Sequence, residues 1–253
     1  MTVAGVSGEK PISPGVRHAM LVYTTPRTLF GRIEDTGAYG WALGTLLAGI
    51  MLIGYVEMKT GLIDRSVDQR TERALAELEK SQAHVVDRIE LRDRMQEIRK
   101  AGEFNKLLAR LAGVVFAPAQ MLASLLLISS MLYGVVALSG RKPEYHTLMA
   151  ICVYAGFVVF LGHVVRLAMV ITYRTIDVDT SLAMLSAPGK ASPLSAVDPF
   201  RIWFWVLVAM GLVITRQLSR RSAIVSCTSM AFLAAGARVA VSMLPAFNSS
   251  GGH

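Results

Sequence analysis

The sequence has little charge and little cysteine for its length. Charged residues make up 17% of the 253 residues, whereas 53% are hydrophobic, which leaves too few charges for the surface of an ordinary soluble protein. The two cysteines, Cys152 and Cys227, both lie in apolar stretches, so no disulfide framework is predicted and both are assigned to packing. The composition therefore predicts an integral membrane protein.

The motifs of common membrane enzymes are also missing. The chain has no His-Glu-x-x-His zinc motif, no Gly-x-Ser-x-Gly nucleophile turn and no Gly-x-x-x-x-Gly-Lys phosphate loop. Ser129 or Ser130 could be considered as a nucleophile with His163 as its base. In an apolar helix, however, a serine hydroxyl usually bonds to a backbone carbonyl and the side chain packs against a neighbouring helix. We therefore expect no catalytic residue, no bound cofactor and no metal ion.

Five apolar stretches divide the chain, and several reach the ~20 residues that a membrane-spanning helix needs. They cover residues 40–56, 111–138, 148–173, 202–215 and 223–244. The fourth is the shortest, but Asp198 can cap its first amides and Pro199 suits an early helical position, so counting from Pro199 makes it long enough. The expected fold is an all-α membrane protein with a five-helix transmembrane bundle.

The net charge of +8 indicates an orientation in the membrane. The basic residues flank apolar spans and do not form a polar face with interleaved aromatics, which argues against nucleic acid as a partner. Because successive loops alternate sides, three basic clusters share one side: Lys10, Arg17, Arg27 and Arg32; Arg141 and Lys142; and Arg216, Arg220 and Arg221. The positive-inside rule makes this side cytoplasmic. Residues 1–39, which lack a signal-peptide core, are then a cytoplasmic amino-terminal segment, and residues 246–253 are a short external tail.

A charged segment, residues 58–110, separates the first span (40–57) from the second. Its helix-forming residues and close charge pairs predict a mostly helical segment: Glu77/Lys80, Glu90/Arg94, Glu97/Lys100 and Glu103/Lys106. Its apolar stripe changes face near residue 90, which argues against one long coiled coil. Two arrangements remain open. The segment either reaches up to ~50 Å from the membrane toward a partner, or forms an amphipathic hairpin on the bilayer or over the helix ends.

Four polar residues in or beside the spans are candidate functional positions. His163 and Arg166 lie on one face of the third span, Arg238 lies in the fifth, and Asp198 stands at the start of the fourth. Ionised groups at membrane depth are costly unless they are paired or hydrated, so they are functional candidates by default. Asp198, Asp177 or Asp179 are candidates to neutralise Arg166, and an arginine that reaches lipid phosphate is favoured over a transport site.

Two features of the spans concern helix shape and packing. Pro118 removes a hydrogen bond within the second span and is a candidate kink, either as a gate or for packing. Small residues let helices approach closely in lipid, and five glycines are candidates for such contacts: Gly134, Gly156, Gly162, Gly211 and Gly236.

The order of several short motifs resembles bacterial Yip-family membrane proteins. These motifs are Pro118 in a long span, Gly140-Arg141-Lys142-Pro143-Glu144-Tyr145, Val153-Tyr154-Ala155, Thr180-Ser181-Leu182-Ala183 and Asp198-Pro199-Phe200-Arg201-Ile202-Trp203. The resemblance covers residues 25–244, and implies five membrane helices with 111–245 as a four-helix Yip-like region. It also implies a multi-pass protein of the bacterial inner membrane without established enzymatic activity. Eukaryotic relatives bind Rab-type GTPases, and some bacterial ones accompany ABC exporters with an adaptor protein.

These observations lead to two functional hypotheses. The first is a noncatalytic accessory or scaffold protein that contacts membrane lipids and another membrane protein, with an ABC-type exporter or its adaptor as the implied partner. Residues 58–110 would face that partner. The alternative is a small transporter or channel with a polar path near His163, Arg166 and Arg238.

Overall fold

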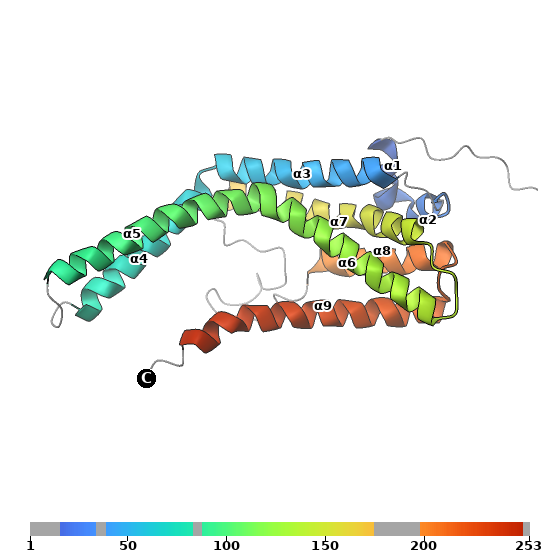
Figure 1. Cartoon of the computed structure of the whole chain (residues 1–253). Helices are drawn as coiled ribbons and strands as arrows, with labels where there is room; N and C mark the ends of the chain where they lie inside the picture. Colours follow the sequence, from blue (N-terminus) through green and yellow to red (C-terminus); the bar gives the residue numbers. More distant parts are fainter. Residues whose placement is uncertain (1–15, 34–38, 83–87, 175–197, 250–253) are drawn as a thin grey trace, which may run out of the picture. The chain divides into compact units, whose positions relative to one another are not determined.

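The computed structural model describes residues 16–33, 39–82, 88–174 and 198–249 (Figure 1). Within these ranges, side chains are described except at residues 16–18, 81–82, 88–90 and 238–249. The regular elements of the described residues are all helices, as the sequence predicts for an all-α protein.

The chain divides into two compact units. One comprises Met1–Leu46, Ala123–Gly162 and Thr180–His253, and the other comprises Leu47–Leu122 and His163–Asp179. Three of the four boundaries fall inside long helices, α3 (Gly40–Lys59), α6 (Ala117–Leu138) and α7 (Tyr145–Tyr173), so each of these helices contributes to both units.

The first unit is built around the amino-terminal half of α7. Residues Leu148 to Ala155 of this helix are all buried, which is the pattern of a helix surrounded by others. Around it are α1 (Val16–Thr24), α2 (Pro26–Phe30), α8 (Pro199–Ile214), α9 (Arg220–Ser249) and parts of α3 and α6. Two glycines permit close packing in this unit. A Cβ on Gly211 would stand 2.6 Å from the Ile151 side chain, and one on Gly162 would stand 2.9 Å from the Phe200 ring.

The second unit contains an antiparallel helical hairpin, α4 (Leu62–Gln82) and α5 (Arg88–Leu111). The chain turns from α3 into α4 at Gly61, whose φ of +68° lies in the region that glycine adopts at little cost. A π-helix, η2 (Ala112–Phe116), joins α5 to α6. In the described part of the charged segment, α4 and α5 are therefore helical, and α5 continues into the second span without a loop.

Three helical stretches are long and apolar enough to cross a membrane. They are Gly40–Lys59, Leu91–Leu138 and Tyr145–Tyr173, in agreement with the first three predicted spans. The fourth differs from expectation, because α8 has 16 residues and rises only about 24 Å, less than the ~30 Å of a typical hydrocarbon core. The predicted fifth span lies in α9. The described residues thus form an all-helical membrane protein, and the count of five spans stays a prediction.

Candidate functional site

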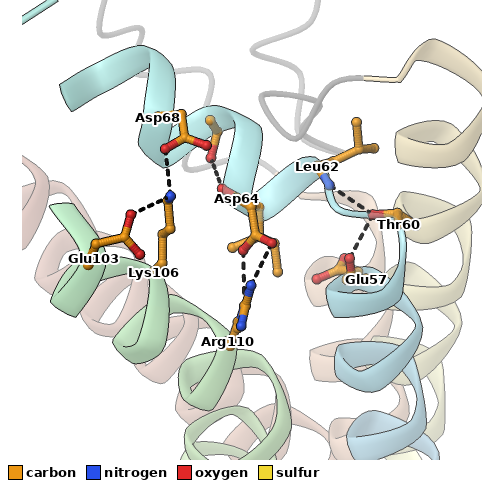
Figure 2. Close-up of polar contacts among 10 residues, drawn as sticks. Glu57, Thr60, Leu62, Asp64, Asp68, Glu103, Lys106 and Arg110 are labelled. Carbon is orange, nitrogen blue, oxygen red and sulfur yellow. Dashed lines mark hydrogen bonds and ion pairs between the residues drawn. The ribbon is translucent and has the colours of Figure 1, made fainter. Parts of the chain in front are cut away.

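Two ion pairs join the helices of the α4–α5 hairpin (Figure 2). Arg110 on α5 contacts both carboxylate oxygens of Asp64 on α4, with Nη2 2.7 Å from Oδ2 and Nε 3.0 Å from Oδ1. One turn further along, Lys106 Nζ lies 2.7 Å from Asp68 Oδ1 and 2.8 Å from Glu103 Oε1. The hydrogen bond from Arg110 lowers the pKa of the Asp64 carboxyl.

The contacts follow the helical period on both sides of the hairpin. Asp64, Asp68 and Thr71 share one face of α4, and Arg110, Lys106 and Gly102 share the facing side of α5. The last pair is tight, because a Cβ on Gly102 would stand 2.8 Å from Thr71 Oγ1. We call these six residues the hairpin seam. Only the local Glu103/Lys106 pair was predicted from the sequence, since the other partners are far apart along the chain.

An apolar stripe remains exposed on α5. It consists of Phe104, Leu107, Leu108 and Leu111, whose exposed fractions lie between 41% and 60%. At 100° per residue, the stripe lies on the opposite side of α5 from Gly102, Lys106 and Arg110. We call it the α5 stripe. The seam thus closes the hairpin without using these four side chains.

The second unit also contains a close backbone contact between α3 and η2. A Cβ on Gly54 would stand 2.1 Å from the carbonyl oxygen of Gly113. Gly113 lies in the π-turn, where the amide of Ala117 bonds to the carbonyl of Ala112. Pro118 follows directly and has no amide hydrogen for the carbonyl of Val114, which accounts for the wider turn. A π-turn therefore lies on the amino-terminal side of Pro118, and the kink at this residue stays a prediction.

Two of the predicted polar residues, Arg166 and Asp198, have different ion-pair partners in the described part of the chain. Arg166 has Glu57 as a partner, with Nη1 3.5 Å from Oε1. Asp198 instead caps α8, accepting a hydrogen bond of 2.9 Å from the amide of Phe200, and pairs with Arg201 at 3.3 Å. His163 is exposed on α7, one turn before Arg166. Asp177, Asp179 and the Arg238 side chain lie outside the described residues.

Ser129, one of the two serines considered as a nucleophile, is buried in α6. Its hydroxyl donates a 3.0 Å hydrogen bond to the carbonyl of Leu126 and lies 3.4 Å from the Tyr145 hydroxyl. This is the backbone contact that serine commonly makes in apolar helices.

The loops that carry the predicted basic clusters meet at one end of the first unit. The Arg141 guanidinium donates a hydrogen bond to the carbonyl of Arg216, which links the α6–α7 loop to the α8–α9 turn. Glu144 strengthens this link by accepting a 3.0 Å bond from the buried amide of Gln217. Gly31, at the end of α2, approaches Ile214 at the end of α8. The described parts of the three basic clusters therefore lie near one another at this end of the first unit, and their orientation in a membrane stays a prediction.

A groove of about 970 Å³ runs between α8 and α9. On α8 it is lined at helical spacing by Ile202, Trp205, Val206, Ala209, Met210 and Val213. The facing residues of α9 include Ile224, Cys227, Ala231 and Phe232. Arg220 lines the groove where α9 begins, the Asp198–Arg201 pair lines it where α8 begins, and Arg27 of α2 also contributes to the lining. Sequence patterns did not predict this groove beyond the apolar character of the two helices.

Comparisons with known proteins identify the family. The family model of the Yip1 domain matches residues 20–241, which is most of the chain. Neither a search of curated proteins nor a search of solved structures finds a match. The family match agrees with the helical spans described above. The chain therefore belongs to the Yip1-domain family of membrane proteins.

Proposed function

We propose that this protein is a noncatalytic accessory subunit that binds another membrane protein through the α4–α5 hairpin. The candidate partner is an ABC-type exporter together with its adaptor protein. The observation that carries the proposal is the α5 stripe, whose four large apolar side chains remain exposed while the hairpin closes through the seam on the other face. Contiguous exposed apolar patches usually mark interaction sites.

The proposal includes the topology derived from the charge pattern. Five spans with the basic clusters on the cytoplasmic side place the amino terminus inside and the hairpin outside. Since Phe104 and Leu111 are seven residues apart, the α5 stripe covers about 10 Å of helix next to the apolar part of the second span. A partner helix at this position would contact the hairpin base and the bundle together. Such helix-in-groove contacts use anchors at i, i+3, i+4 and i+7, the spacing of these four residues.

Affinity purification of stripe variants tests the proposal. The tagged full-length protein would be extracted from its native membrane in mild detergent and its partners identified by mass spectrometry. The test variant is Phe104→Asn, Leu107→Asn, Leu108→Asn. The matched control is Glu72→Asn, Arg73→Asn, Glu79→Asn, which changes three exposed polar residues of α4 in the same hairpin. We expect an exporter or adaptor to copurify with the wild type and the control, and to be lost from the stripe variant.

Two results would contradict this function. A partner retained by the stripe variant would exclude the stripe as its binding site. A homo-oligomer without partners in all three samples would instead favour an autonomous transporter. Recovery of each variant from the membrane fraction checks that insertion is intact.

The Arg166–Glu57 pair favours the transporter as the second candidate. The Glu57 side chain is only 18% exposed, and its partner Arg166 lies well inside the apolar helix α7. Ionisable residues inside spans mark ion pathways more often than chance. We would compare proton flux into vesicles containing wild-type protein, Arg166→Gln or the surface control Arg73→Gln. Flux that is lost only with Arg166→Gln, at equal incorporation, would support transport, and the absence of flux from wild type would count against a proton path.

A further inference from the structure

We propose that the groove between α8 and α9 binds an anionic phospholipid, with one acyl chain along the groove and the phosphate between Arg27 and Arg220. This site is separate from the hairpin and does not depend on its proposed partner. Three properties of the groove support it: its length, its lining and the distribution of charge along it.

The groove has the size of an acyl-chain site. Its lining on α8 extends from Ile202 to Ile214, which corresponds to about 18 Å of helix. Half of a bilayer's hydrocarbon core is about 15 Å thick, so a chain from one leaflet would fit this length. The volume of about 970 Å³ lies at the upper end of the ~300–1,000 Å³ typical of ligand sites.

The lining is apolar and mixes small and large side chains, a surface against which a flexible hydrocarbon chain can pack. Alanines at 209 and 231 leave room between larger neighbours such as Met210 and Phe232. Ile202, Val206 and Ile224 are each more than half exposed, so the groove is open along its side. A lipid can therefore enter laterally from the bilayer, without passing through the protein.

Charge differs between the two ends of the groove. Among the described side chains at the α8 amino terminus, Arg201 pairs with Asp198 at 3.3 Å. Arg220 begins α9 at the opposite end, and Arg27 of α2 also lines the groove. Both arginines are exposed, and no carboxylate among the described residues pairs with either of them. Two arginines at the mouth of an apolar groove complement a phosphate headgroup above its chain. They also lie on the side of the basic clusters, where anionic lipid would gather around them.

Lipid retention measures this site directly. Full-length protein would be reconstituted in nanodiscs containing equal amounts of phosphatidylglycerol and phosphatidylcholine, extracted with mild detergent, and its retained lipids quantified by mass spectrometry. The test variant is Arg27→Gln, Arg220→Gln. The control is Lys142→Gln, Arg221→Gln, which removes two exposed charges from the same side without touching the groove. A third variant, Ala231→Trp, fills the groove and leaves all charges in place.

The three variants have different expected outcomes. Wild type and control should retain phosphatidylglycerol in preference to phosphatidylcholine. Loss of each groove arginine should lower this preference about fivefold, the approximate contribution of one basic residue near an anionic surface. Ala231→Trp should reduce the retention of both lipids. Equal retention by wild type and the arginine variant would overturn the proposal. An equal loss in the control would also overturn it, since the effect would then come from general surface charge.

Discussion

The contact between Gly54 and Gly113 predicts that two identical substitutions will have different effects. In Gly54→Ala, the new Cβ would stand 2.1 Å from the Gly113 carbonyl oxygen and 2.4 Å from its carbon. Ordinary contact begins at 3.4 Å, so the backbones of α3 and η2 must separate by about 1 Å. In Gly113→Ala, the new Cβ would meet Gly54 Cα at 3.5 Å, which needs no movement. The asymmetry arises because the Cβ position of Gly54 points at the Gly113 carbonyl, whereas the Cβ position of Gly113 lies at ordinary contact distance from Gly54.

The difference in stability between the two variants can be estimated. Both gain similar helix propensity on replacing glycine by alanine, so this contribution cancels in the comparison. What remains is overpacking, which costs about 1–3 kcal/mol and occasionally more. For a chain of this size, such a difference lowers the unfolding midpoint by roughly 2–12 °C.

Thermal unfolding of the purified variants checks this estimate. Both proteins would be heated in the same detergent, and the fraction that still elutes as a monodisperse peak would be measured at each temperature. Gly113→Ala should match or exceed the wild type, and Gly54→Ala should unfold first. Equal midpoints, or the reverse order, would refute the inferred contact between α3 and η2.

Three further predictions concern the hairpin, the α8 cap and the π-turn. Because Arg110 lowers the pKa of Asp64 in the folded chain, this pair contributes its full stability to the hairpin at pH values above the unfolded pKa of about 3.9. The contribution is lost as the pH falls through the lower pKa of the folded state. The protection of α4 amides, corrected for the intrinsic exchange rate at each pH, should therefore fall in acid for wild type, and Asp64→Asn should reduce this pH dependence to the part that the Lys106–Asp68 pair contributes. Asp198→Ala should destabilise the start of α8 by about 1 kcal/mol, measured as faster exchange of its first amides, whereas Asp198→Asn should retain protection. Pro118→Ala restores a donor for the Val114 carbonyl, so the π-turn should become α-helical and change the labelling of a cysteine placed at Val115.

Local sequence signals predicted the features that depend on near neighbours. Asp198 followed by proline predicted a helix start, and Asp198 does cap the amide of Phe200. Periodicity and length predicted the first three spans. Among the predicted close-packing glycines, Gly162 and Gly211 have side chains near their Cβ positions, whereas Gly134 has no neighbour within 4 Å among the described residues.

Features that join distant segments could not be predicted in the same way. Arg166 pairs with Glu57, 109 positions away, and the residues between them gave no reason to prefer this carboxylate over Asp198. Several arrangements of the charged segment satisfied its local charge pairs, and only the packing of α4 on α5 brings Arg110 to Asp64. Gly54 and Gly113 were missed because each looks like an ordinary small residue until the facing helix is known.

The length of α8 has a consequence for the surrounding bilayer. In the proposed five-span arrangement, a helix of 16 residues is about 6 Å shorter than a typical hydrocarbon core. The lipid beside it must thin locally or the bundle must tilt, and each response costs a fraction of a kcal/mol per Å of mismatch. This cost is smaller in a thin membrane. Membrane thickness alone would therefore favour accumulation of the protein in thinner membranes, without a receptor that recognises a sorting signal.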